Sequence, residues 1–376
     1  MNIIRALLLW PLLLSCALTI AVADAATIQD GPYVTLGPDG HGVARWVEGE
    51  PGALRPREEQ VAIGSELVVP AVGRVPAFPV TLRAPAAAEP DEVALPSATP
   101  LFVMADTHGE FEIAVELLQR HNVIDSQLRW SFGRGHLAVL GDAVDRGPHH
   151  TEILWLLYKL EAEAARAGGG LHFVLGNHES MMLAGDQRYL NPKYLAVRDA
   201  LGLVNYASLW SEETLLGQWL RTRAVVMKIG DYLVLHGGIS RETVDRKLTL
   251  AQMNDEVRRA LGNRHRDSYV LTAAGPQWYR GYFPEAARQG GFTPATLEDV
   301  DAALAFYKVK AIFVGHTVVP TVAPLYGGRV VAVQVYPHRD AATGRAVMEG
   351  VLVRRGAFHR ARVDGGLEPL AGATGK

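Results

Sequence analysis

Five short apolar runs are the clearest pattern in this chain, and each of them ends at polar residues. The runs cover residues 101–105, 137–140, 171–175, 232–235 and 311–314. Apolar runs of four or five residues, bounded by glycine or polar side chains, are typical of strands that are buried on both faces. In open α/β sheets, ligands bind beyond the carboxyl ends of the strands. We therefore expect the side chains that follow the five runs to meet in one crevice.

Two further patterns indicate helices between these strands. Apolar residues recur at helical spacing over residues 110–120 and again over 151–167, where three glycines end the pattern. The alternation of strand and helix predicts an α/β catalytic domain over residues 100–366. Residues 367–376 show no such pattern and are predicted to form a disordered tail.

The segment before the first buried run has a different character. Residues 26–99 contain only short strand-like runs with turns between them, and residues 84–100 are rich in proline. We expect a small β-rich N-terminal region that is joined to the catalytic domain by a linker.

The first 25 residues have the organisation of a secretory signal peptide. A short basic start is followed by an apolar stretch over residues 6–20 and by the small residues Ala23-Asp24-Ala25. We therefore expect export, to the periplasm in a bacterium. Leu13-Leu-Ser-Cys16 also resembles a lipoprotein box, so lipid anchoring through Cys16 is an alternative. Pro11 and the length of the stretch disfavour a membrane span, and we expect none in the mature protein.

Composition narrows the possible chemistry. Cys16 is the only cysteine, so the chain can form no internal disulfide, and cleavage near Ala25 would remove the thiol. A phosphatase with a cysteine nucleophile is thereby excluded. The formal net charge is −3 and the basic residues are scattered, so we expect no nucleic-acid partner.

The residues that follow the five runs are of the types that bind metal ions. They occur in five motifs: Asp106-Thr-His108-Gly, Gly-Asp142-Ala-Val-Asp145-Arg146-Gly, Gly-Asn177-His178-Glu, His236-Gly-Gly and Gly-His316. An Asp-x-His pair after a strand places a carboxylate and an imidazole on one ion. Asp142 has enough lone pairs to bridge two ions, and Asn177, His236 and His316 would complete the second site. Oxygen and nitrogen ligands without sulfur favour Mn, Fe or Zn as the two ions.

The remaining motif residues fit the hydrolysis of a phosphoester. Two ions about 3.5–4 Å apart can bind a shared hydroxide that attacks phosphorus in line with the leaving oxygen. Arg146 is suited to bidentate binding of phosphoryl oxygens, and Arg280 is a candidate for a second such contact. His178 can protonate the leaving oxygen as a general acid, with Asp145 orienting its ring. His149 and His150 are expected to be solvated residues of a first helical turn.

The ordered set of motifs resembles the calcineurin-like metallophosphoesterases, and within them the phosphoprotein phosphatase division. The Asp30-Gly-Pro-Tyr-Val segment, Gly133-x-Gly-His136 and Trp278-Tyr-Arg280-Gly are similar to the bacterial Shewanella-like phosphatases. The resemblance covers roughly residues 28–336. It implies a four-layer α/β/β/α sandwich, a dinuclear metal centre and hydrolysis of phosphomonoesters. The resemblance also implies that Asn177 contacts phosphate in addition to binding a metal ion.

We therefore expect an exported phosphatase that acts on phosphoprotein, including phosphotyrosine. Gln334 stands where the Shewanella-like branch often has an aspartate, and it cannot act as an anion there. This departure affects the expected substrate and not the metal chemistry. One alternative keeps the metals but has a nucleotide or another small phosphoester as substrate. A second alternative is a non-catalytic metal- or phosphate-binding protein, which would not require His178 or Arg146.

Overall fold

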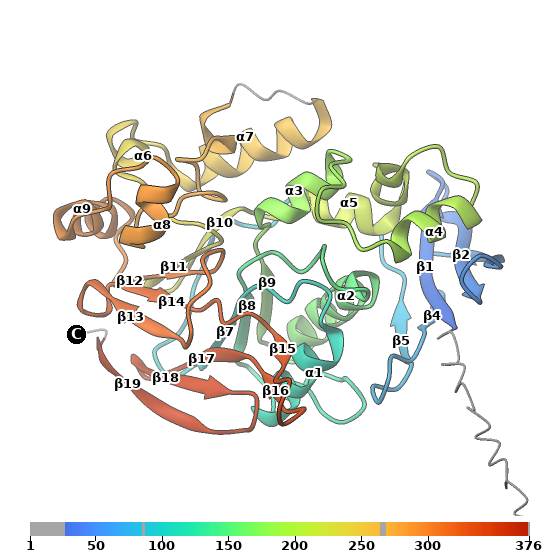
Figure 1. Ribbon diagram of the computed structural model, residues 1–376, viewed down its shortest axis with the longest axis horizontal. Helices are drawn as coiled ribbons and strands as arrows, with labels where there is room; N and C mark the ends of the chain where they lie inside the picture. Colours follow the sequence, from blue (N-terminus) through green and yellow to red (C-terminus); the bar gives the residue numbers. More distant parts are fainter. Residues whose placement is uncertain (1–26, 85–86, 264–267, 375–376) are drawn as a thin grey trace, which may run out of the picture.

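Two six-stranded sheets form the centre of the protein (Figure 1). The computed structural model describes residues 27–84, 87–263 and 268–374. From edge to edge, the first sheet consists of β19 (Leu367–Thr374), β18 (Ala357–Arg362), β17 (Glu349–Arg354), β7 (Leu101–Met104), β8 (His136–Val139) and β9 (Gly170–Phe173). The second consists of β13 (Ala323–Leu325), β14 (Val330–Ala332), β12 (Ala311–Val314), β11 (Tyr232–Leu235), β10 (Val226–Ile229) and β6 (Glu92–Val93).

The two sheets pack face to face, and the alternation of side chains along each strand shows how. In β7, Leu101 and Val103 belong to the apolar cluster between the sheets, together with Phe313 of the second sheet. Phe102 and Met104 point to the opposite face and belong to the core beneath the helices. All four residues of β7 are buried, which explains why its sequence is a continuous apolar run and not an alternating one.

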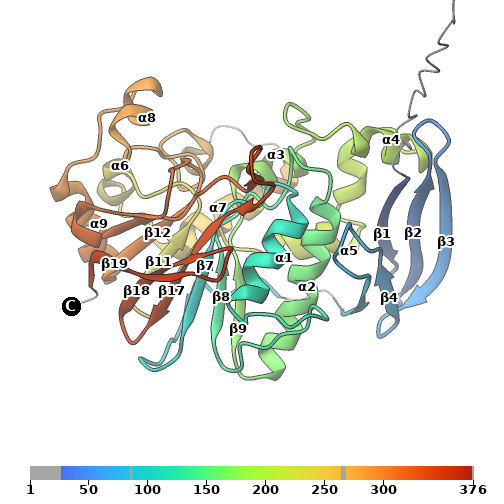
Figure 2. The same cartoon turned by 60° about the horizontal axis from the view of Figure 1, so that its bottom comes forward.

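Helices cover the outer face of each sheet, as the two views show (Figures 1 and 2). On the side of the first sheet lie α1 (Phe111–Arg120), α2 (His150–Arg166), α3 (Asn177–Leu183), α4 (Lys193–Ala200) and α5 (Leu215–Arg221). On the side of the second lie α6 (Arg241–Asp245), α7 (Leu250–Asn263), α8 (Pro284–Gln289) and α9 (Leu297–Tyr307). Short 3-10 turns occur at Tyr206–Trp210, Tyr269–Leu271 and Tyr326–Gly328. The predicted four-layer α/β/β/α arrangement is confirmed.

The N-terminal region is built of strands, as predicted. A three-stranded antiparallel sheet consists of β1 (Ile28–Leu36), β2 (His41–Gly49) and β3 (Arg55–Ala62), and a two-stranded sheet of β4 (Glu66–Val69) and β5 (Phe78–Thr81). These strands pack on the side of α2, where the indole nitrogen of Trp155 donates to the carbonyl oxygen of Pro32 at 2.8 Å. The proline-rich segment is more than a linker, because β6 within it pairs in parallel with β10.

A buried ion pair ties the N-terminal region to the catalytic layers. Lys193 Nζ of α4 lies 2.6 Å from Asp30 Oδ2 of β1, and it also donates to the carbonyl oxygen of Pro148 at 2.6 Å. The hydroxyl of Tyr33 donates to the other oxygen of Asp30 at 2.9 Å. Because Pro148 closely follows Asp145 and Arg146, the N-terminal strands support the loop that carries two predicted site residues.

The C-terminal segment of the chain is a strand. The predicted disordered tail over residues 367–376 is wrong for most of its length, because β19 pairs with β18 and extends the first sheet. Its sequence is short and rich in glycine and alanine, so tertiary pairing and not local pattern makes it a strand.

The predicted signal peptide over residues 1–25 lies outside the described residues. Among the described helices, none is long and apolar enough to cross a membrane.

Candidate active site

Strand register brings the five motifs together. β7, β8 and β9 run parallel, with Met104 opposite Val139 and Val139 opposite Phe173, so their carboxyl ends share one edge of the first sheet. In the second sheet β11 and β12 are parallel with Leu235 opposite Val314, which places His236 and His316 side by side. His236 Nδ1 lies 2.6 Å from the carbonyl oxygen of Leu140, and this contact joins the ends of the two sheets.

The carboxylate of Asp142 is the centre of the cluster. Its Oδ2 atom lies 3.0 Å from His236 Nε2 and 3.8 Å from the Nε2 atoms of both His108 and His178. Its Oδ1 atom accepts a hydrogen bond of 2.9 Å from the backbone N–H of His178. One oxygen thus faces three imidazoles while the other is fixed by the backbone, which is the arrangement required of a ligand shared by two ions.

The six predicted metal ligands all lie in this cluster. Two groups of side chains can each hold an ion, His108 with Asp142 and His178, and Asp142 with His236 and His316. Asp106 joins them, with its Oδ2 atom 3.8 Å from His108 Nε2 and its Oδ1 atom accepting from the backbone N–H of His316 at 3.2 Å. Asn177 Oδ1 lies 3.0 Å from His236 Nε2. Their role as ligands is still a prediction, but all six positions are compatible with it.

The orientation of the imidazoles fits bound cations. The Nδ1 atoms of His108 and His236 lie 3.0 and 2.6 Å from the carbonyl oxygens of Val144 and Leu140. A proton on each Nδ1 leaves the Nε2 lone pair directed at the centre of the cluster. His316 Nε2 is buried and has no hydrogen-bond partner within the described part of the chain. A buried nitrogen without a partner is costly, and a metal ion would satisfy it.

The pKa values of the cluster also favour bound cations. Burial raises the pKa of Asp106 to about 7 and lowers that of His108 to about 3. Burial also opposes a charge on His236, but the carboxylates of Asp142 and Asp106 outweigh it and raise the pKa to about 9. Two adjacent buried carboxylates therefore require positive charge, and a neutral His108 is a competent ligand.

His178 differs from the other imidazoles because its Nδ1 atom faces a carboxylate. The distance from Nδ1 to Asp145 Oδ2 is 2.7 Å, and Asp145 is fully buried. Burial opposes a charge on His178, but the hydrogen bond that it donates to Asp145 and the nearby charge of Asp142 raise its pKa above the usual value. His178 also belongs to one of the two groups that can hold an ion, but the raised pKa and the contact with Asp145 favour proton donation as its role.

Two arginines and a tyrosine surround the mouth of the site. Arg146 is exposed, and its guanidinium nitrogen lies 3.5 Å from His178 Nε2. Arg280 is half-buried, and burial lowers its pKa although the charges of Asp142 and Asp106 oppose that effect. The ring of Tyr189 lies 4.9 Å from that of His178 and is 46% exposed. Tyr189 lies in no motif that the sequence analysis identifies.

The loop with Gly237 and Gly238 explains how Arg280 reaches the site. The backbone N–H groups of both glycines donate to the carbonyl oxygen of Pro276, at 2.8 and 3.1 Å. A Cβ at Gly237 would come within 2.8 Å of the backbone nitrogen of Tyr279. The absence of a side chain therefore lets the segment that carries Arg280 lie directly against the end of β11.

Glu179 is the most important residue that sequence reasoning missed. It is fully buried, and its carboxylate accepts backbone hydrogen bonds from Asp142 at 2.9 Å, Ala143 at 2.7 Å, Val144 at 3.3 Å and Gly176 at 2.7 Å. It thus holds the loop after β8 against the start of α3. Its place as the third residue of a helix, where glutamate commonly bonds back to the helix start, is the signal that could have identified it.

His150 was expected to be solvated, and that prediction is wrong. Its side chain is fully buried and stacks on Tyr194 with ring centroids 3.5 Å apart. The backbone N–H of Asp145 donates to His150 Nδ1 at 3.3 Å. His150 therefore supports the loop that carries Asp145, a role that depends on the distant Tyr194 and is invisible in the local sequence. His149 is only partly buried and lies 3.2 Å from Glu152.

Substitution Glu179→Gln should weaken metal binding. The amide nitrogen cannot accept a hydrogen bond, so at least one backbone N–H near Asp142 loses its partner and the carboxylate shifts. Losses of about 10- to 100-fold in metal affinity are typical when such supporting groups are removed. Metal content after dialysis against a graded chelator measures this effect, with Glu116→Gln on the outer face of α1 as the control. Equal metal retention in both variants would contradict the role assigned to Glu179.

Comparison with known proteins identifies the family of the chain. Residues 99–320 match the family profile of the calcineurin-like phosphoesterases. Two solved structures of cold-active protein tyrosine phosphatase, one titled as that of a psychrophile Shewanella sp., are 31% identical to the chain. They have TM-scores of 0.80 and 0.78, covering 93% and 91% of this chain and 100% and 99% of theirs. Shewanella-like protein phosphatase 2 of Arabidopsis thaliana is 27% identical over 263 residues, 58% of this chain and 66% of that protein. The chain therefore belongs to the calcineurin-like phosphoesterases and is a metal-dependent phosphoric ester hydrolase.

Proposed function

We propose that this protein is an exported phosphatase that removes phosphate from phosphorylated proteins, with phosphotyrosine as its preferred residue. The observation that carries the proposal is the mouth of the site. There the exposed Tyr189 and Arg146 lie beside His178, the predicted proton donor, which is buried with Asp145. A protein tyrosine phosphatase with 31% identity and nearly complete coverage supports the choice of substrate.

The mouth suits an aromatic phosphoester. The ring centroids of Tyr189 and Tyr336 each lie 5.7 Å from the guanidinium carbon of Arg146, so two aromatic faces surround the predicted phosphate contact. Tyr336 also lies 5.9 Å from His108, close to the metal ligands. Aromatic pairs are worth about 0.5–1.5 kcal/mol beyond the area they bury. A phenyl ring of the substrate can gain this energy here, and a serine side chain cannot.

The open form of the mouth fits a protein substrate. Tyr189 is nearly half exposed and Arg146 is exposed, while Asp142 and His178 directly beneath them are buried. A residue that projects from a protein surface can therefore reach the buried groups without the site enclosing its flanking chain. A small phosphoester would be expected to have a more closed, polar pocket.

Each group of the chain has a distinct part in the proposed reaction. Asp106, His108, Asp142, Asn177, His236 and His316 would hold two ions, with Mn, Fe or Zn favoured by the ligand types. When bound, these ions would supply an activated water nucleophile and stabilise the negative charge on the phosphoryl oxygens. Arg146 and Arg280 orient the phosphoryl group for in-line attack, and Asn177 contacts it. His178 donates a proton to the leaving oxygen while Asp145 stabilises the imidazolium.

The first test is turnover on matched substrates. The purified protein, loaded with Mn, should hydrolyse a phosphotyrosine peptide with a higher kcat/KM than the same peptide with phosphoserine, and higher than nucleotide monoesters or diesters. Tyr189→Ala should reduce kcat/KM for phosphotyrosine by about 2- to 10-fold, the loss expected for one aromatic contact, and spare phosphoserine. Equal or greater turnover of a nucleotide would favour the small-molecule alternative. No metal-dependent turnover on any of them would leave only a binding function.

The second test is the pH dependence of Asp145→Asn. His178 donates only when it is protonated, so activity should fall as the pH rises through its raised pKa. Removing the Asp145 carboxylate lowers that pKa, so the alkaline limb of kcat should move to lower pH. Above neutral pH, kcat of the variant should fall by roughly 100-fold or more. The fall in kcat should be smaller for p-nitrophenyl phosphate, because its leaving group needs little protonation. An unchanged alkaline limb, or loss of a metal ion from His178→Ala, would assign His178 a different role.

The third test concerns export, which we propose from the first 25 residues alone. Expressed in a bacterium with a periplasm, the full chain should appear there with a mature N-terminus at Ala26. Mass spectrometry of the purified protein measures this directly, and Cys16→Ser should leave the product unchanged. A lipid-modified Cys16 at the N-terminus would establish the lipoprotein alternative. An intact Met1 in the cytoplasm would contradict export.

A further inference from the structure

A groove runs along α1 beside the hairpin of β15 (His338–Arg339) and β16 (Ala346–Val347), which lies next to α1 in Figure 1. It consists of two hollows with volumes of about 520 and 490 Å³. Four residues line both hollows, Arg74, Glu116, Arg120 and Arg339. Because the hollows share these residues, they form one continuous surface, which we call the α1 groove.

The α1 groove carries arginines whose charges are not neutralised. Arg74, Arg339 and Arg345 are exposed, and their guanidinium groups have no hydrogen-bond or ion-pair partner among residues 27–84, 87–263 and 268–374. Arg120 is nearly as free, since its closest carboxylate, that of Glu116, is 3.9 Å away and the pair is partly exposed. Three to four cations therefore face solvent along one groove.

The acidic residues of the groove are already engaged elsewhere. Glu112 accepts a hydrogen bond of 3.0 Å from the backbone N–H of Arg74. Glu349 accepts two bonds, from the hydroxyl of Thr321 at 2.8 Å and the backbone N–H of Val322 at 2.7 Å. Asp364 accepts from a backbone N–H at 2.8 Å and lies 3.2 Å from Arg362. These carboxylates thus have other partners, while the guanidinium groups of Arg74, Arg339 and Arg345 have none among the described residues, so the groove presents unpaired positive charge.

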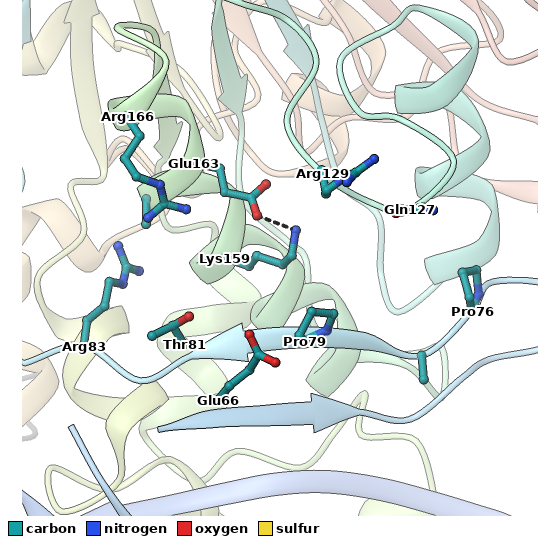
Figure 3. A pocket seen from close by; sticks show the side chains of 12 residues that line it. Glu66, Pro76, Pro79, Thr81, Arg83, Gln127, Arg129, Lys159, Glu163 and Arg166 are labelled. Atoms are coloured by element: carbon teal, nitrogen blue, oxygen red, sulfur yellow. Dashed lines mark hydrogen bonds and ion pairs between the residues drawn. The ribbon is translucent and has the colours of Figure 1, made fainter. Parts of the chain in front are cut away.

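A second hollow on the same molecule shows that basic residues in a hollow are not generally left without a carboxylate partner. The hollow between β5 and α2, drawn in Figure 3, is also lined by several basic residues. There Lys159 lies 2.7 Å from Glu163, and Arg83 lies 3.0 Å from Glu161. Most of its cations are thus paired within the protein. The α1 groove differs because its free cations require an external partner.

The α1 groove begins close to the active site. Arg339 follows Tyr336 by three residues, a span of at most about 10 Å along the chain, and the ring of Tyr336 lies 5.9 Å from His108. A polypeptide whose phosphorylated residue occupies the site can therefore continue into the groove.

We propose that the α1 groove binds an acidic stretch of the protein substrate, located next to the phosphorylated residue. The proposal rests on the proposed action on phosphoprotein and specifies which phosphoproteins are favoured. Carboxylates of the substrate would pair with Arg74, Arg339 and Arg345. These arginines line the groove and are not among the predicted site residues, so the groove selects among substrates without taking part in the reaction.

The test compares two triple variants of the full protein with equal loss of charge. R74Q/R339Q/R345Q removes the free cations of the groove. R134Q/R166Q/R355Q removes three exposed arginines that line neither hollow of the groove and have no side-chain partner within the described residues. Binding of a fluorescent peptide with four aspartates is measured for each variant, with an asparagine version of the peptide and an oligonucleotide of equal charge as probes. Turnover is measured on phosphotyrosine peptides with the same flanks and on p-nitrophenyl phosphate.

We expect the groove variant to bind the aspartate peptide about 10-fold more weakly, a loss typical of several exposed ion pairs, and to show a similar rise in KM. Its kcat on p-nitrophenyl phosphate should equal that of the wild type, and added salt should remove the preference for aspartate. Equal losses in the control variant would overturn the proposal, as would tighter binding of the oligonucleotide than of the peptide. Because peptide binding is measured without turnover, absence of phosphatase activity would refute the proposed function and leave the binding result to decide on the groove.

Discussion

The structure depends on one requirement, that the buried carboxylate of Asp142 must face positive charge. One of its oxygens is 3.0–3.8 Å from three imidazoles, and the side chain is buried. A carboxylate buried in this way is stable only with a cation or a protonated partner. Two metal ions meet the requirement and leave His108 and His236 neutral as ligands. The carboxylate of Asp106 nearby increases this need for positive charge, and His178 is distinguished from the other two imidazoles by the contact of its Nδ1 atom with Asp145.

The fold positions Asp142 through contacts to the backbone of its loop. Three parallel strand pairings, β7 with β8, β8 with β9 and β11 with β12, bring the motifs together. Glu179 fixes the loop after β8 by accepting four backbone hydrogen bonds. The backbone of Asp142, with φ of 50°, and of His316, with φ of 62°, adopts the left-handed conformation that side chains other than glycine rarely take. Such strain persists only where the surrounding structure imposes it, and it is typical of functional sites. The buried pair of Lys193 and Asp30 extends this support to the N-terminal strands.

Much of this arrangement could be predicted from the sequence because it depends on patterns of neighbouring residues. The strand that precedes Asp106 is a continuous apolar run, and its polar end is visible without any knowledge of the fold. Residues whose role depends on distant partners could not be predicted in this way. His150 was expected in solvent because the Tyr194 that covers it comes 44 residues later. The strand at residues 367–374 forms because β18 offers an edge, and Tyr189 reaches His178 from a loop that has no motif.

The claim that two ions share Asp142 is tested most directly by anomalous X-ray diffraction from crystals grown with manganese. The account predicts two anomalous peaks about 3.5–4 Å apart. Asp142 Oδ2 should lie between them, with Asp106 and His108 on one ion and Asn177, His236 and His316 on the other. His178 Nε2 should bind neither ion. A single peak, or a peak coordinated by His178, would contradict the account.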